Sequence, residues 1–598
     1  MAFSCQCIHV SASARRPSIS PDFDSQKSLL SSTVKPLLKE LQARPMRVDV
    51  PQTLRNASRY LLDAFVDSVF KFADQPLLPS QSNFAPVGEI GEAVKITSIE
   101  GEIPIDFPEG IYIRNGPNPL FGGLQSTVSV FGRSSDIWVE GEGMLHAVHF
   151  TKDSGGKWSV FYKNKYLDTE TFRIEKECNR PLFLPTIEGD SPAILAAYLL
   201  NQLRFGKVNK DICNTNVFEH SGKVYSIAEN YLPQEIDIFS LNSHGNWDVN
   251  GSWDRCFTAH PKRAPGTGEL VITGVDAVKP FLVLGVVSAD GKRLVHKVDL
   301  KLERSIICHE IGVTEQYNVI MDIPLVVDIN RLVRGGPLIK YEKDGYARIG
   351  VMPRYGDSES IMWFDVQPHC IFHILNCFEE GEEVVVRGFR QLKAIIPGPD
   401  FGHNRFEWFS RGFKPINDES IEDGSFFSRL HEWRLNMATG EAKERRLTGD
   451  EFSMDFPMIN ENYIGLRNNY GYAQVADSNA SSSCALPKYG GVAKLCLEDQ
   501  NNRISKNDSE EEMINVKYHK IGEKQFCTGA AFVARNGGLE EDDGWIVTFV
   551  HNEETNVSQV HIIDTKKFDG EAIVKITLPQ RVPYGFHGTF ISTIPKNV

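Results

Sequence analysis

The chain has 598 residues, of which 41% are hydrophobic and 24% are charged, the composition of a folded protein with a large core. Its formal net charge of −14 argues against nucleic acid as the main partner, because a polyanion binds basic surfaces. No run approaches the roughly 20 uncharged apolar residues of a membrane-spanning helix. The eleven cysteines are scattered without a CxxC pair, which favours a reducing compartment over a disulfide framework.

The first 35 residues differ from the rest of the chain. They are rich in serine, they contain the pair Arg15 and Arg16, and the first acidic residue is Asp22. They lack the apolar core of a secretory signal, and this composition is typical of an organelle transit peptide. We therefore expect residues 1–35 to be a disordered targeting segment, with a disordered tail that carries no address as the alternative.

Residues 36–84 are expected to form an N-terminal helical extension. From Asp49 to Phe72, apolar residues recur at three- and four-residue spacing, and charged residues recur every fourth residue on the other side. This pattern predicts an amphipathic helix. Two placements stay open, since such a helix either packs on the body of the protein or lies on a membrane surface.

After Pro86 the pattern changes to short alternating runs separated by turn residues. Examples are GIYIRNGPNP (110–119), GKVYSIAEN (222–230), FLVLGVVSADGK (281–292) and EEVVVRGFR (382–390). So many short strands over roughly 500 residues do not fit one open sheet of ordinary size. A propeller of four-stranded blades suits this length, and we expect an all-β domain of this kind over 85–598.

One uncharged segment interrupts the strands. Ser191 is suited to cap the start of a helix, Pro192 to occupy its first position, and Gly206 to end it. No charge occurs from Ser191 to Leu203. We expect a helix here that is either buried or forms an apolar patch that dips into one leaflet of a membrane.

Four of the sixteen histidines, His260, His309, His373 and His587, lie in unusual surroundings. Their separations of 49, 64 and 214 residues exclude local motifs such as HExxH or a zinc finger. The spacing does allow four different blades to send one imidazole each to a common axis. Taken singly, each histidine is more typical of a surface or a hydrogen-bonded core position.

The sequence around these histidines resembles the carotenoid cleavage dioxygenases, a family of seven-bladed propellers with iron on the axis. The plant members are the most similar. The resembling stretches, in chain order, are YIRNGPNP (112–119), GMLHAV (143–148), AHPK (259–262), CHEIGVTEQYNVIMDIPL (308–325), WFDVQPHCIFH (363–373), DFPMIN (455–460), EEDDGW (540–545) and RVPYGFHG (581–588).

The resemblance implies that His260, His309, His373 and His587 bind iron(II), Fe(2+). It implies oxidative cleavage of a carotenoid or apocarotenoid double bond by O₂, with carbonyl products. It also implies a plastid location, with the cytoplasm as the alternative. Four neutral imidazoles leave the iron its full 2+ charge and, in octahedral geometry, up to two open positions.

In the family, glutamates orient three of the four histidines. By resemblance, Glu229 would hold His309, and Asp455 stands where many relatives have the glutamate that would hold His373. Gly529 stands at the third position, so His587 is expected to lack a carboxylate partner, which typically costs about 10–100-fold in metal affinity or activity.

Two further residues lie in or beside these stretches. His146, in GMLHAV, is interpreted as structural. Phe372, adjacent to His373, is a candidate substrate contact, with ordinary core packing as the alternative.

Two other functions stay open from the sequence. One is an enzyme that isomerises a polyene, or cleaves a stilbene-type compound, on the same iron centre. The other is a non-catalytic carotenoid-binding homologue, which the changes at Asp455 and Gly529 suggest. A carotenoid is too insoluble to arrive through water, so we expect peripheral contact with a membrane, and we predict no protein partner.

Overall fold

The computed structural model describes residues 52–74, 82–394, 426–498 and 513–593, apart from the single positions 124, 138 and 485. The chain divides into two compact units, Met1–Ser58 and Arg59–Val598, and the second contains the strands described below. The targeting segment expected over 1–35 lies outside the described residues.

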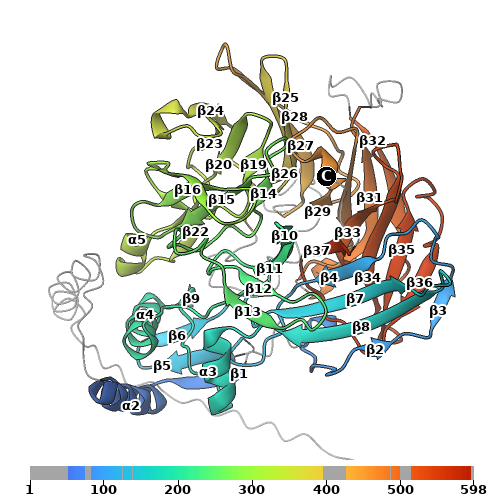
Figure 1. The fold of residues 1–598 in the computed structure, drawn as a ribbon. Coiled ribbons are helices and arrows are strands. Elements are labelled where there is room, and N and C mark those ends of the chain that lie inside the picture. Colours follow the sequence, from blue (N-terminus) through green and yellow to red (C-terminus); the bar gives the residue numbers. More distant parts are fainter. Residues whose placement is uncertain are drawn as a thin grey trace, which may run out of the picture. The chain divides into compact units, whose positions relative to one another are not determined.

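The strands of the second unit form seven antiparallel blades (Figure 1). The first blade is β37 (Gly588–Ser592), β4 (Gly110–Arg114), β7 (Met144–Lys152), β8 (Trp158–Tyr166) and β2 (Val94–Lys95). The second is β10 (Asn216–His220), β11 (Lys223–Ile227), β12 (Gln234–Ile236) and β13 (Ser243–Asn246). The third is β14 (Lys262–Arg263), β15 (Leu270–Val275), β16 (Leu282–Val287) and β17 (Leu294–Asp299).

The remaining blades follow in chain order. The fourth is β19 (Gly312–Val313), β20 (Tyr317–Asp322), β23 (Ala347–Pro353) and β24 (Met362–Val366). The fifth is β25 (Cys370–Glu380), β26 (Glu383–Gln391), β27 (Arg429–Asn436) and β28 (Ala442–Arg446). The sixth is β29 (Met454–Met458), β30 (Tyr470–Ala476), β31 (Tyr489–Cys496) and β32 (Asn515–Lys520), and the single pair of Tyr489 with Cys527 joins it to β33 of the next blade. The seventh is β33 (Gln525–Ala534), β34 (Gly544–Asn552), β35 (Val557–Asp564), β36 (Val574–Thr577) and β3 (Ile99–Gly101).

The ring of blades is closed by strands from both ends of the chain. The C-terminal β37 pairs with β4, from Gly588 opposite Arg114 to Ser592 opposite Gly110. The N-terminal β3 pairs with β36, with Ile99 opposite Ile576. Such closure removes long exposed strand edges. The predicted all-β, seven-bladed propeller is thus confirmed, and the four runs quoted from the sequence contain β4, β11, β16 and all of β26 except its last residue.

Burial along neighbouring strands follows their position in a blade. Every residue of β16, LVLGVV, is buried, whereas β17, LVHKVD, alternates between partly buried and exposed residues. A strand inside a blade is covered on both faces by the adjacent blades, so it is apolar throughout. The outer strand has one face toward solvent, so its side chains alternate with the period of two that a strand dictates.

Two small sheets and several helices lie outside the blades. The sheets are β1 (Lys71–Asp74), β5 (Gln125–Ser129), β6 (Gly132–Ser135) with β9 (Glu188–Gly189), and β18 (Ser305–Ile306), β21 (Leu325–Val327) with β22 (Ile339–Tyr341). The helices are α2 (Gln52–Val69), α3 (Glu170–Cys178), α4 (Ser191–Phe205), α5 (Ile329–Val333), α7 (Ser478–Cys484) and short 3-10 turns at Ser82–Phe84, Ser358–Ser360 and Glu461–Tyr463. None of the described helices is long and apolar enough to cross a membrane.

Helix α4 lies where the uncharged segment predicts a helix, and Gly206 ends it with φ of 70°. The prediction that Ser191 caps its start was wrong, because Asp190 is the N-cap residue. The Asp190 carboxylate makes no capping bond and instead accepts the backbone N–H of Arg133 on β6, at 2.8 Å. This tertiary contact fixes where the chain enters the helix.

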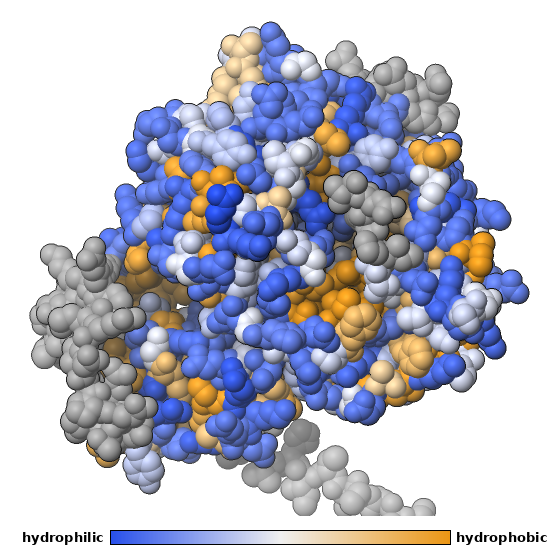
Figure 2. Space-filling view, viewed as in Figure 1, coloured by the Kyte–Doolittle hydropathy of each residue, from blue (hydrophilic) through white to orange (hydrophobic). Residues whose placement is uncertain are grey.

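The amphipathic helix α2 runs from Gln52 to Val69, within the predicted span. Its Val66 is buried in a cluster with Leu200 of α4, whereas Leu61 and Phe65 are exposed. The apolar residues therefore cover a wider arc of the helix than α4 can bury. On the face drawn in Figure 2, which is mostly hydrophilic, hydrophobic residues show at the lower left, where α4 and β6 lie.

Candidate metal centre

The four histidines all lie at the innermost strands of blades. His260 precedes β14, His309 precedes β19, His373 lies within β25, and His587 precedes β37. The innermost strands of a propeller surround its axis, so side chains from different blades meet there. The structure brings these four together into one group, in which the ligand atoms all lie within 4.8 Å of one another.

The Nε2 atoms of the four rings face each other. The Nε2 atoms of His260 and His309 are 3.1 Å apart, those of His309 and His373 are 3.3 Å apart, and those of His373 and His587 are 3.1 Å apart. Two nitrogens that bind one ion at right angles, each about 2.1 Å from it, are separated by about 3.0 Å. The spacing is therefore that of ligands around a single metal ion.

Two carboxylates fix the protonation of two rings. Glu229 accepts a hydrogen bond from Nδ1 of His309, and Asp455 accepts one from Nδ1 of His373 at 2.7 Å. Because a carboxylate only accepts, each Nδ1 carries a proton, and in the neutral form of each ring Nε2 presents a lone pair. The two lone pairs face each other at 3.3 Å, an arrangement that a shared cation stabilises and that no hydrogen bond between them satisfies.

The other two rings are neutral for a different reason. Burial holds the pKa of His260 and that of His587 well below the ordinary value, and the neighbouring histidines and Lys262 lower both further. For His309, burial lowers the pKa, but the charge and the hydrogen bond of Glu229, together with the charges of Glu310 and Asp455, raise it above the ordinary value. Neutral imidazoles are the form that binds metal.

His587 is held by its backbone. Its N–H donates to the carbonyl of Thr215 at 3.3 Å, and its carbonyl accepts from the N–H of Asn115 at 3.0 Å. Among the described residues, none hydrogen-bonds to Nδ1 of its ring. The space that a side chain at Gly529 would need is filled, since a Cβ there would lie 2.1 Å from Cγ of Arg114.

Arg114 contacts the same loop that carries His587. Its Nη2 donates to the carbonyl of Pro583 at 2.8 Å, and the side chain is buried. A Cβ added at Gly585 in this loop would also collide with the guanidinium. The Arg114 side chain thus supports the loop that carries His587 by binding the backbone of that loop.

Aromatic side chains surround the histidines. The ring of Phe456 lies 5.0 Å from that of His373 and 4.8 Å from that of His587, measured between centroids. Sequence reasoning missed Phe456, although it directly follows Asp455. The ring of Phe372 lies 5.6 Å from that of His309, and it also packs against a core cluster. His146 lies outside the group and bonds to the hydroxyl of Tyr162 at 2.8 Å.

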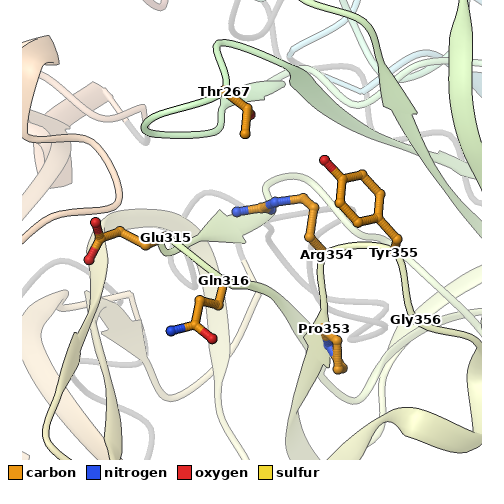
Figure 3. Close-up of a pocket in the computed structure, with 7 residues that line it drawn as sticks. All are labelled: Thr267, Glu315, Gln316, Pro353, Arg354, Tyr355 and Gly356. Carbon is orange, nitrogen blue, oxygen red and sulfur yellow. The ribbon is translucent and has the colours of Figure 1, made fainter.

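An open cavity of about 450 Å³ lies apart from the histidines (Figure 3). It is lined by Thr267, Glu315, Gln316, Pro353, Arg354, Tyr355 and Gly356. Thr267 lies in the turn after β14, and Glu315 in the turn after β19, whereas the histidines precede these strands. The cavity is therefore at the opposite ends of these strands and is not part of the histidine site.

The donor set fits a metal ion. Four imidazoles with facing Nε2 atoms, two of them buried and two half-buried, suit iron(II), and the same donors also accept zinc or copper. A second acidic group, Glu540, Asp542 and Asp543, does not share this chemistry, because Lys566 forms ion pairs with all three.

Comparison with known proteins agrees with this geometry. The carotenoid 9,10(9',10')-cleavage dioxygenase 1 of Pisum sativum is 32% identical over 549 residues, 89% of this chain and 93% of that protein. The 9-cis-epoxycarotenoid dioxygenase NCED1, chloroplastic, of Oryza sativa subsp. japonica is 28% identical, over 91% of this chain and 80% of that protein.

Solved structures share the fold. The lignostilbene dioxygenase of Pseudomonas brassicacearum superposes with a TM-score of 0.70 at 22% identity, over 87% of this chain and 100% of that one. The apocarotenoid oxygenase of Synechocystis gives 0.66 at 19% identity, over 85% and 97%. A family model described as retinal pigment epithelial membrane protein matches residues 84–592. The chain therefore belongs to this family, the carotenoid oxygenases.

Proposed function

We propose that the chain is a non-haem iron(II) dioxygenase that cleaves a double bond of a carotenoid or apocarotenoid with O₂. One carbon–carbon double bond and one O₂ become two carbonyl groups. The observation that carries the proposal is the pair of facing Nε2 atoms of His309 and His373, 3.3 Å apart, with the two rings oriented by Glu229 and Asp455. The printed names of the plant relatives support the substrate class.

The roles of the residues follow from their contacts. When bound, iron(II) would supply the redox chemistry toward O₂, which zinc cannot supply. His260, His309, His373 and His587 would hold it as neutral ligands. Glu229 and Asp455 orient two of the rings and keep their protons on Nδ1. The rings of Phe372 and Phe456 cover the histidines with apolar surface, where they exclude water, and Phe372 would touch the polyene.

We also propose that the protein extracts its substrate from a membrane surface. Tyr60 and Leu61 on α2 are 76% and 70% exposed, and Leu203 on α4 is 58% exposed. Val130, in the turn between β5 and β6, is 85% exposed. Helix α2 packs on α4, and Phe131 of the same turn stacks on Phe70, which directly follows α2. We therefore treat the exposed Tyr60, Leu61, Leu203 and Val130 as one apolar surface, the α2–α4 surface.

For the organisation of the chain, we propose a plastid-targeting segment over 1–35, a helical extension over 36–84 and a catalytic propeller over 85–598. The rice relatives named chloroplastic support a plastid location.

Product analysis tests the catalytic proposal. The full chain, loaded with iron(II), is incubated with β-carotene, zeaxanthin, an epoxycarotenoid and an apocarotenoid, with and without O₂. We expect shorter products whose masses show one added oxygen each, formed only with O₂, and none from a His309→Ala variant. A product of unchanged mass would show an isomerase instead. Tight binding of carotenoid without any product would show a carotenoid-binding protein.

A further inference from the structure

Glu310, directly after His309, has a buried carboxylate that the metal site described above does not use. The side chain is 4% exposed. One carboxylate oxygen forms an ion pair with Nζ of Lys262, and the other accepts the backbone N–H of Ile374 at 2.6 Å. A buried carboxylate is costly unless both oxygens are satisfied, and here each oxygen has a partner.

These partners belong to the segments that carry two other histidines. Lys262 lies two residues after His260, at the start of β14, and Ile374 directly follows His373 in β25. The backbone of Glu310 also forms an isolated parallel bridge with His260. One residue therefore joins three of the four histidine-bearing segments, which come from three different blades.

The contact with Ile374 falls where β25 is irregular. The pairing of β25 with β26 shifts register between Ile371 and Ile374, on either side of His373. Such a bulge redirects a side chain and disturbs the regular ladder of hydrogen bonds. The Glu310 carboxylate binds the backbone N–H at this point, so it stabilises the bulge that directs His373 toward the axis.

We propose that Glu310 is a positioning residue that sets the spacing of His260, His309 and His373 through Lys262 and the backbone of Ile374. The proposal rests on the proposed function in one respect, that these histidines bind a metal. It assigns Glu310 no contact with the metal or the substrate. Its effect is to hold three Nε2 atoms at the separations of 3.1 and 3.3 Å that one ion requires.

The test uses the full chain loaded with cobalt(II), whose visible spectrum reports the arrangement of the ligands, and measures its release to a chelator. We expect Glu310→Ala to alter the spectrum and to release cobalt about 10–100-fold faster than the wild type. Glu310→Gln keeps an oxygen that accepts from Ile374, so its spectrum should lie closer to that of the wild type, with slower release than in Glu310→Ala.

Glu541→Ala is the matched control. Glu541 is 7% exposed, and its carboxylate accepts the backbone N–H groups of Asn469 and Tyr470, each at 2.8 Å, outside the histidine group. Its loss should lower the unfolding temperature but leave the cobalt spectrum and the release rate unchanged.

The proposal is overturned if Glu310→Ala folds and matches the wild type in spectrum and release. If Glu310→Ala does not fold, Glu310→Gln and Lys262→Met decide, and a wild-type spectrum with wild-type release in both overturns it. If the wild type binds no cobalt, the proposed metal site itself is wrong. The failure of the proposed function is thus distinguishable from a failure of Glu310 alone.

Discussion

At position 529 the backbone has φ of 67°, a left-handed conformation that favours glycine. The sequence raises the expectation that a glutamate here would supply the missing partner of His587, provided that the backbone allows a side chain. The structure shows that it does not, because Arg114 occupies the space. Arg114 and Asn115 support the loop that carries His587, at the place where the family resemblance implies a carboxylate.

We therefore expect Gly529→Glu to lower the free energy of unfolding by about 2 kcal/mol or more, without tightening metal binding, because left-handed strain and overlap with Arg114 add. Gly537→Glu is the matched control, since Gly537 has φ of 74° and no atom within 4 Å of an added Cβ. It should cost only about 1 kcal/mol. Chemical denaturation measures both, and equal losses in the two variants would show that Arg114 moves aside.

Contacts between distant residues limit what the sequence predicts at this scale. The four histidines, Glu229 and Asp455 are all named from their resemblance to family motifs, and the structure places these six residues in one group of contacts. The sequence does not identify Arg114, Phe456 and Glu310 as site residues, although each lies within a resembling stretch. Their partners are up to 469 positions away in the sequence, and no local pattern reports such contacts.

Among the elements, strands inside blades are the most predictable, because burial on both faces makes them apolar and β-branched, as in β16. The start of α4 is less predictable, since Asp190 is set by its bond to Arg133 and not by a local cap. The exposed part of α2 also escapes the pattern, because spacing shows that a helix is apolar but not which of its apolar residues α4 covers.

The α2–α4 surface leads to a prediction about these two helices. Leu203→Glu should weaken binding to liposomes that contain carotenoid by about tenfold, because a charge at the apolar surface opposes insertion. Leu203 is already exposed, so the unfolding temperature should stay unchanged. Leu539→Glu makes the same change at a residue that is 96% exposed in the turn between β33 and β34, and it should leave liposome binding unchanged. Equal binding of all three proteins in a flotation assay would refute the assignment of this surface.

At the scale of the whole molecule, the ring is what makes a shared site possible. The pairing of β37 with β4 joins residues near the two ends of the chain and places His587 beside histidines that lie 214 or more residues earlier. The number of strands and the turns between them predict a propeller. The blades are not visible as sequence repeats, so the pattern alone does not show which strand closes the ring.

The central claim is that four histidines from four blades bind one iron ion, and the iron content of the purified full chain tests it most directly. The wild type should hold one iron per chain, and each of His260→Ala, His309→Ala, His373→Ala and His587→Ala should lose most of it. His220→Ala removes a buried histidine of β10 that bonds to the carbonyl of Ser288 outside the group, and it should keep its iron. Full iron content in any of the four variants, or none in the wild type under conditions that load iron, would contradict the account.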